Sequence, residues 1–261
     1  MQPDNWGSLA RIGLFIVSRE VVPEAEWWAM CPPGVSIHAA RVAAPAPWAL
    51  WRDDRNGVEL APDMVRGCEA FNAIAPDVVV LAHSSSSFVG GPDWDEAVIG
   101  AMADQLAPET TATTNGLDTR LALARLGVSR PFLMMPAWMN DRLIESAVSY
   151  YAAFGIVIPA ASRYVPPPPW RDIAPQHLYE RGMATAQETD LLLEQVCREC
   201  PPEADSVLLA GTGFRCTAII ETLEARLGRP VVAANQASLW RALGVAGVRV
   251  PIAGYGRLLA G

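Results

Sequence analysis

Short runs of apolar and β-branched residues alternate along the chain with stretches whose apolar residues recur at three- and four-residue spacing. The first pattern predicts buried strands, and the second predicts amphipathic helices. Their alternation is typical of an α/β protein with parallel sheets. We expect strands at 12–17, 35–42, 78–82, 131–135, 156–159, 207–210 and 231–234, and helices near 23–30, 62–74, 93–106, 117–126, 140–154, 176–197, 217–227 and 237–243.

Two polar loops follow two of these strands in equivalent places. Residues 81–88 read Leu-Ala-His-Ser-Ser-Ser-Ser-Phe, and residues 209–216 read Leu-Ala-Gly-Thr-Gly-Phe-Arg-Cys. Both loops are rich in hydroxyl groups, glycines and backbone N–H groups, which suit anionic oxygen. If the two loops face each other, a small carboxylate fits between them. The chain is therefore expected to be an enzyme.

A second repeated element indicates an internal duplication. Asn115 and Asn235 each precede a helical stretch and are expected to cap it. Two copies of strand–loop–helix followed by strand–Asn–helix predict duplicated α/β halves. We expect the first half to span residues 1–114, completed by about residues 236–261, and the second half to span residues 115–235.

Composition and charge narrow the classes of partner. The chain has 261 residues, 51% of them hydrophobic, so it can bury a large core in one or two domains. The formal net charge of −8 leaves no basic patch for nucleic acid or an anionic membrane. No apolar run reaches the about 18 residues that span a bilayer, and the segment 1–6 lacks a signal pattern. A cytoplasmic protein is expected.

The cysteines indicate neither disulfides nor a metal site. There are five, and they are scattered along the chain. Cys197 and Cys200 have the spacing of a redox or zinc motif, but no second pair or nearby histidine completes it. No phosphate loop and no GxGxxG motif follows a strand. We therefore expect no metal and no nucleotide cofactor.

A proline run at residues 166–169, followed by Trp170, is too long for a helix or a sheet. It predicts a stiff, exposed loop. We expect a plain connector rather than a lid over a binding site.

Several segments carry a resemblance to a known family. Residues 11–14, 20–27, 32–41, 235–240 and 254–258 resemble the isomerase branch of the aspartate/glutamate racemase superfamily, within the group of maleate cis-trans isomerases and arylmalonate decarboxylases. The resemblance covers nearly the whole chain. It implies two Rossmann-like halves with the active site between them, no organic cofactor or metal, and proton or covalent chemistry at an α-carbon. It also implies a homo-oligomer.

The chain departs from this family at both loops. The family usually places one cysteine at the start of each loop, and the resemblance puts His83 at the first position and Gly211 at the second. A mechanism with two thiols is then excluded. Arylmalonate decarboxylases keep only the second cysteine. By this resemblance the single protic group of this chain, His83, would lie on the opposite side of the site, in the first loop.

His83 is the candidate catalytic residue. Imidazole titrates near neutral pH, and chemistry at Cα needs a group that holds and returns a proton. Ser84, Ser85, Thr212 and Gly213 would supply hydroxyl and backbone donors for a carboxylate or an enediolate oxyanion. The competing interpretation is a buried histidine bonded to its own loop, beside serines that have no function.

Further candidates are weaker. Trp138 lies where relatives carry a tyrosine that donates to a substrate carboxylate, and it is equally interpreted as a core aromatic. Ser18 and Arg19 replace a segment that supplies a substrate-binding asparagine, and Arg19 either pairs with a carboxylate or faces solvent. Asn235 belongs to a family-like segment. Cys216 is favoured as a packing residue over a nucleophile.

The leading hypothesis is a cofactor-independent lyase, with decarboxylation favoured, that acts at the α-carbon of a small carboxylate or dicarboxylate. His83 would donate or accept the proton. One alternative is an isomerase or racemase of the maleate isomerase type with altered catalytic groups. The other is a non-catalytic protein that binds carboxylates.

Overall fold

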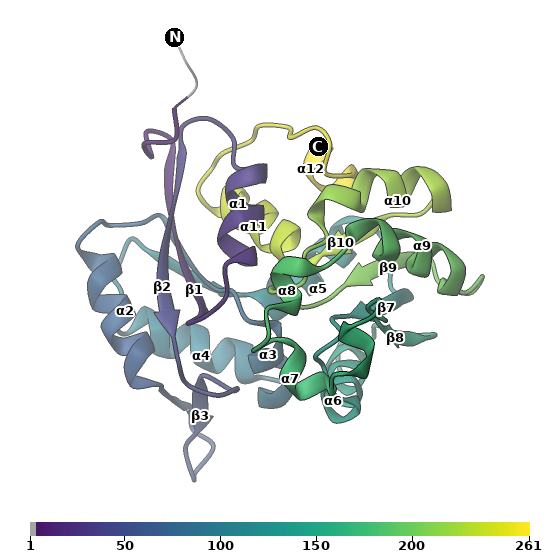
Figure 1. Ribbon diagram of the computed structural model, residues 1–261. Coiled ribbons are helices and arrows are strands. Elements are labelled where there is room, and N and C mark those ends of the chain that lie inside the picture. The colour runs from purple at the N-terminus through teal and green to yellow at the C-terminus, as the bar shows by residue number, and fades with distance from the viewer. Residues whose placement is uncertain (1–3) are drawn as a thin grey trace.

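A computed structural model describes residues 4–261 and contains two four-stranded parallel sheets side by side (Figure 1). The first has the order β2(Val35–Val42), β1(Ala10–Val17), β5(Val78–Leu81), β6(Thr111–Thr114). The second has the order β10(Val231–Ala233), β9(Ser206–Leu209), β7(Pro131–Met135), β8(Ala161–Arg163). All pairings within both sheets are parallel. The predicted α/β class with parallel sheets is confirmed.

The two sheets have the same topology. Numbered within its own half, each sheet runs second, first, third and fourth strand across its width. The chain passes from one sheet to the other between Thr114 and Pro131, through α5(Asn115–Arg125). A small antiparallel hairpin, β3(Ala49–Trp51) and β4(Val58–Leu60), lies outside both sheets.

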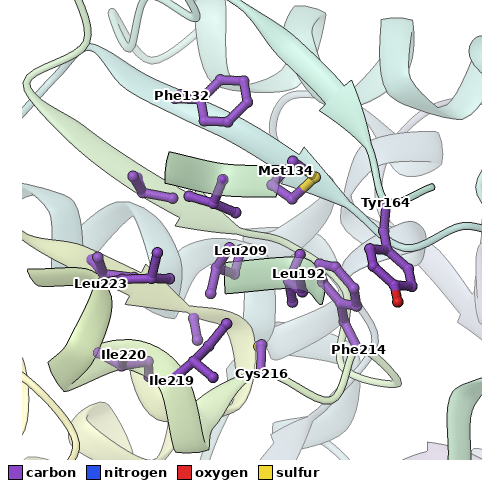
Figure 2. Close-up of a cluster of buried hydrophobic side chains, with 14 of the residues drawn as sticks. Phe132, Met134, Tyr164, Leu192, Leu209, Phe214, Cys216, Ile219, Ile220 and Leu223 are labelled. Atoms are coloured by element: carbon purple, nitrogen blue, oxygen red, sulfur yellow. The ribbon is translucent and has the colours of Figure 1, made fainter. Parts of the chain in front are cut away.

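Helices cover both faces of each sheet. On the first sheet, α2(Pro62–Asn72) and α4(Trp94–Ala103) pack on one face, and α1(Val22–Met30) and α11(Ala234–Val245) pack on the other. On the second sheet, α9(Thr189–Glu199) and α10(Ile220–Leu227) cover one face, and α5 and α6(Asp141–Ala152) cover the other. Figure 2 shows the core beneath α9 and α10, with Leu192, Leu209 and Leu223 among its members.

The other helical segments are short. They are α3(Ser84–Gly90), η1(Trp170–Asp172), α7(Pro175–Leu178), α8(Met183–Ala186), η2(Thr217–Ile219) and α12(Arg257–Ala260). No helix in residues 4–261 is long and apolar enough to cross a membrane. Residues 1–3, the start of the segment without a signal pattern, lie outside the described residues.

The structure corrects four local predictions. Residues 156–159 form no strand, because the Ile156 and Val157 amides donate to the carbonyl groups of Tyr151 and Ser129. The strand of this region is β8, which begins at Ala161. The helix expected at 176–197 is broken into α7, α8 and α9, with Gly182 at a φ of 91°. The first polar loop, residues 81–88, is helical from Ser84 on, as α3. The asparagines do not cap: Thr114 caps α5, and Asn235 is the second residue of α11.

Candidate active site

A cavity of about 280 Å³ lies where carboxyl ends of strands from both sheets meet. Ligand sites of open parallel sheets lie at this edge. The first half contributes Val17, Glu20 and the start of α3, and the second contributes the residues after β7 and β9. The lining residues are Val17, Glu20, His83, Ser84, Ser85, Trp138, Met139, Leu143, Gln176, Tyr179, Gly211, Thr212 and Gly213. The loops that begin at His83 and at Gly211 therefore share one cavity.

The surroundings of His83 fix its tautomer. Its ring stacks on Trp48 with centroids 4.2 Å apart, and its Nδ1 lies 2.9 Å from the Ser86 hydroxyl. The Ser86 oxygen accepts the Trp48 amide hydrogen, and among the described residues its own hydrogen has only Nδ1 as acceptor. The proton of a neutral His83 ring is thus assigned to Nε2.

Burial lowers the pKa of His83 to about 3, because the charged ring is poorly solvated there. At pH 7 the ring is therefore neutral. It carries one donor and one acceptor nitrogen rather than a positive charge. Its chemistry in the cavity is that of an imidazole N–H group.

Both loops present backbone N–H groups that the fold leaves free. Among residues 4–261, the amides of Ser84, Ser85, Gly211, Thr212 and Gly213 have no hydrogen-bond acceptor. Buried amides in proteins are almost always paired, so a row of unpaired ones at a cavity indicates a site for an oxygen-bearing ligand. The two rows come from different halves and can hold anionic oxygens from two directions.

Two glycines shape the second loop. Gly211 has a φ of 116°, and a Cβ there would lie 2.8 Å from Pro136 Cγ, so a larger residue strains the loop. A Cβ on Gly213 would lie 2.5 Å from Glu20 Oε1. The absence of a side chain at Gly213 lets the Glu20 carboxyl group rest against this loop.

A buried polar network holds both loops in place. The Ser84 hydroxyl donates to Asn115 Oδ1 at 2.6 Å, and Asn115 in turn donates to the Ala234 carbonyl at 2.8 Å. Asn235 donates to the Thr212 carbonyl at 2.8 Å and to Glu26 Oε2 at 2.7 Å. The repeated asparagines thus position the loops. The Ser84 hydroxyl is committed to Asn115, which corrects its expected role as a side-chain donor to a ligand.

Glu20 lines the cavity but was not among the predicted site residues. It is 7% exposed, and its Oε2 has no hydrogen-bond partner among residues 4–261. Desolvation raises the pKa of Glu20 to about 7, against a smaller lowering by the Tyr179 hydroxyl. A position directly after a strand is a sequence signal for a site residue, and Glu20 has such a position after the first strand. In this segment the predicted partner of a substrate carboxylate was the neighbouring Arg19.

Four of the weaker candidates lie outside the cavity wall. Ser18 and Arg19 are exposed, and Arg19 pairs with Glu180 at 3.2 Å, so the solvent-facing interpretation holds. Cys216 is buried in the core of the second half (Figure 2), and desolvation raises the pKa of its thiol well above the usual value. Asn235, the fourth, is buried in the network under the second loop.

Trp138 lines the cavity and packs edge-on against Tyr179, with ring centroids 5.3 Å apart. Tyr179 and Gln176 come from the segment that follows the proline run, so this segment is more than a plain connector. No sequence pattern pointed to Gln176 or Tyr179, because both lie in the stretch predicted as one long helix. Within residues 4–261 no cluster of three or more His, Cys, Asp or Glu side chains could hold a metal ion.

Comparisons with known proteins give one family match and several similar folds. A family model described as arylmalonate decarboxylase matches residues 62–259. No curated protein sequence matches the chain significantly. The fold is similar to that of unliganded arylmalonate decarboxylase, with a TM-score of 0.74 and 23% identity over 96% of this chain and 98% of that one.

The fold is also similar to two maleate isomerases. For the enzyme Iso from Pseudomonas putida the TM-score is 0.79 and the identity 18%, over 97% of this chain and 98% of that one. For the cis-trans isomerase of Nocardia farcinica the values are 0.75 and 21%, over 96% and 98%. A mutant of the Nocardia enzyme carries a covalently bound succinylcysteine intermediate.

Proposed function

We propose that this chain, which belongs to the arylmalonate decarboxylase family, is a cofactor-independent lyase that removes a carboxyl group from the α-carbon of a small carboxylate or dicarboxylate. Its family and fold support an activity of the decarboxylase or maleate isomerase type. The choice between the two rests on the residues of the cavity.

The observation that carries the proposal is the pair of free amide rows in a cavity without a thiol. Five backbone N–H groups of the lining residues have no acceptor among residues 4–261, and none of the five cysteines lines the cavity. Such donors stabilise the charge of an enediolate. Decarboxylation needs this stabilisation and one proton, whereas a succinylcysteine intermediate needs a cysteine nucleophile.

The proposed reaction balances without a co-reactant. In a dicarboxylate with both carboxylates on Cα, the bond between Cα and one carboxylate breaks, CO₂ leaves, and the electron pair passes into the other carboxylate to give an enediolate. The loop amides bind the enediolate oxygens. A proton then adds to Cα, and water restores it to the protein. His83 takes part through its Nε2–H group, which donates a hydrogen bond to an enediolate oxygen, because Ser86 engages Nδ1.

Two other functions would use the same cavity. An isomerase or racemase would move a proton on and off Cα without losing CO₂, and a binding protein would only hold the carboxylate. Incubation with phenylmalonate, maleate and amino or hydroxy acids in D₂O, followed by NMR, separates the three. Loss of a carboxyl group supports the lyase. Deuterium at Cα without loss of CO₂ supports the isomerase or racemase and contradicts the lyase, and binding without either leaves only the binding protein.

The first prediction concerns the Thr212 hydroxyl, which makes no hydrogen bond to the described residues although its carbonyl accepts one from Asn235. Thr212→Ala should lower kcat by about a hundredfold, measured with the substrate that the NMR experiment in D₂O identifies, because this is the usual loss when one oxyanion donor is removed. The control is Thr222→Ala, because Thr222 is exposed on α10. A decrease confined to KM would mean that Thr212 binds substrate and transition state equally.

The second prediction is that turnover is independent of metal and nucleotide. Neither the lining residues nor the family resemblance supplies a ligand set for a metal. Dialysis against EDTA should leave kcat and KM unchanged. Activity that disappears and returns with a divalent ion would contradict this.

The homo-oligomer implied by the resemblance stays a prediction, and light scattering measures it.

A further inference from the structure

We propose that Glu20 is a second acid/base residue of this cavity and the group that exchanges protons with the substrate α-carbon at neutral pH. This inference rests on the proposed function, and it assigns to Glu20 a chemical role that complements His83. Three observations carry it: the position of the carboxyl group, its lack of structural partners, and the groups that surround it.

The position is defined by the second loop. Glu20 lines the cavity with His83 and Thr212, and its Oε1 lies 2.5 Å from the point where a Cβ on Gly213 would stand. Trp138 Cζ2 lies 3.4 Å from that same point. The carboxyl group therefore lies at the wall formed by the second half, whereas His83 begins the first loop.

A comparison with Glu26 shows that the Glu20 carboxyl group is not used to hold the fold. Glu26, on α1, accepts the Cys216 and Thr217 amides on Oε1 and the Asn235 amide on Oε2. Glu20 is equally buried, but its fully covered Oε2 has no hydrogen-bond partner among the described residues, and the Tyr179 hydroxyl is the one side-chain donor beside the carboxyl group. An unpartnered buried carboxyl group costs stability, and such groups concentrate at functional sites.

No positive charge compensates the carboxyl group. Arg41 donates to the Glu20 backbone carbonyl at 2.7 Å, but its charge pairs with Glu24, and Arg19 pairs with Glu180. From the segment after the proline run the Tyr179 hydroxyl faces Glu20. The part of the second loop that lines the cavity, residues 211–213, carries no titratable side chain, and Arg215 and Cys216 do not line the cavity.

Burial without a counter-ion raises the pKa of Glu20 to about 7, while His83 stays neutral. At neutral pH Glu20 is thus the group that both carries and releases a proton.

Glu20 supplies the proton that adds to Cα after CO₂ has left. Protonated Glu20 transfers its hydrogen to Cα of the enediolate, becomes a carboxylate, and regains a proton from water. In the reverse sense the carboxylate removes a proton from Cα of an arylacetate. In both the forward and the reverse step, the neutral His83 ring donates a hydrogen bond from Nε2–H to an enediolate oxygen and keeps its proton.

The test measures kcat, KM and their pH profiles for wild type, Glu20→Gln, Glu20→Asp and Glu180→Gln, with phenylmalonate as substrate. Glu20→Gln should lower kcat by about two to four orders of magnitude, with KM changed much less. In the wild type, kcat/KM should fall as pH rises through about 7, and this fall should be absent from the residual activity of Glu20→Gln. Glu20→Asp should retain it, and Glu180→Gln should behave as wild type. Normal turnover by Glu20→Gln, or a pH profile that it does not change, overturns the inference.

Deuterium exchange at Cα of phenylacetate in D₂O separates failure of this inference from failure of the proposed function. If the wild type exchanges deuterium but releases no CO₂ from phenylmalonate, the lyase proposal fails, and the role of Glu20 is still decided by whether Glu20→Gln loses the exchange. If the wild type does neither, both proposals fail.

Thermal unfolding distinguishes a catalytic from a structural role of Glu20, because the two roles predict changes in Tm of opposite sign for Glu20→Gln. The unfolded chain releases the Glu20 proton near pH 4.5, and the folded protein releases it near 7, so folded stability falls across that window and stays low above it. Glu20→Gln should therefore raise Tm at pH 8, and much less at pH 5. A lower Tm at both pH values would mean a structural role and would contradict the inference.

Discussion

Replacing His83 with asparagine or alanine is expected to lower kcat by about two to three orders of magnitude, because an N–H donor to the enediolate oxygen is lost, while KM changes much less. The ring presents Nε2 to the cavity because Ser86 engages Nδ1 and Trp48 holds the ring by stacking. Asparagine keeps a hydrogen-bonding side chain but cannot place an N–H group at the Nε2 position. The measurement is steady-state turnover of the substrate found in the D₂O screen.

His38 provides the matched control for His83. Its Nε2 also lies 2.9 Å from a serine hydroxyl, that of Ser36, but it does not line the cavity. His38→Asn should leave kcat within a factor of about two, because it touches no substrate. Near-normal turnover by His83→Asn, in a protein whose melting curve shows it folded, would remove His83 from the mechanism.

The largest expected loss of stability follows from replacing Glu26 with alanine. Its carboxylate accepts three hydrogen bonds, from the Cys216 amide at 2.6 Å, the Thr217 amide at 2.8 Å and the Asn235 side chain at 2.7 Å. Each buried donor left without an acceptor costs about 1–3 kcal/mol, so the free energy of unfolding should fall by about 4 kcal/mol. Urea unfolding measures this loss.

Glu24→Ala is the control for Glu26→Ala, since Glu24 lies on the same helix and pairs with Arg41 at the surface. A surface ion pair of this kind contributes about 0–1 kcal/mol. Equal losses for the two variants would show that the Glu26 hydrogen bonds add no net stability. Residual Glu26→Ala protein should also bind carboxylates poorly, because the second loop loses its anchor.

Local pattern was sufficient for six of the eight sheet strands and for the two loops, whereas β6 was not predicted and β8 lies beyond its predicted position. Buried strands such as 35–42 have an unbroken apolar or alternating character, and the duplicated loop pointed to His83 and Gly211 in one cavity. These features are encoded within about ten residues of chain.

The parts that sequence patterns missed depend on contacts between distant residues. Four serines in a row have low helix propensity, yet α3 forms because Ser84 donates to Asn115 and Ser87 donates to Asp95. The importance of Glu20 comes from burial, which no local pattern reveals beside the exposed Arg19. Tertiary structure, not composition, made this carboxyl group a candidate for chemistry.

Helix α11 belongs to two hydrophobic cores at once, and this determines how the protein unfolds. Leu239 and Leu243 pack with the strands of the first sheet, while Ala237 packs with those of the second. Removing α11 from either sheet would expose apolar surface of both. We therefore expect the two halves to unfold together in a single cooperative transition, and a fragment limited to residues 1–114 to fail to fold because α11 no longer covers its sheet.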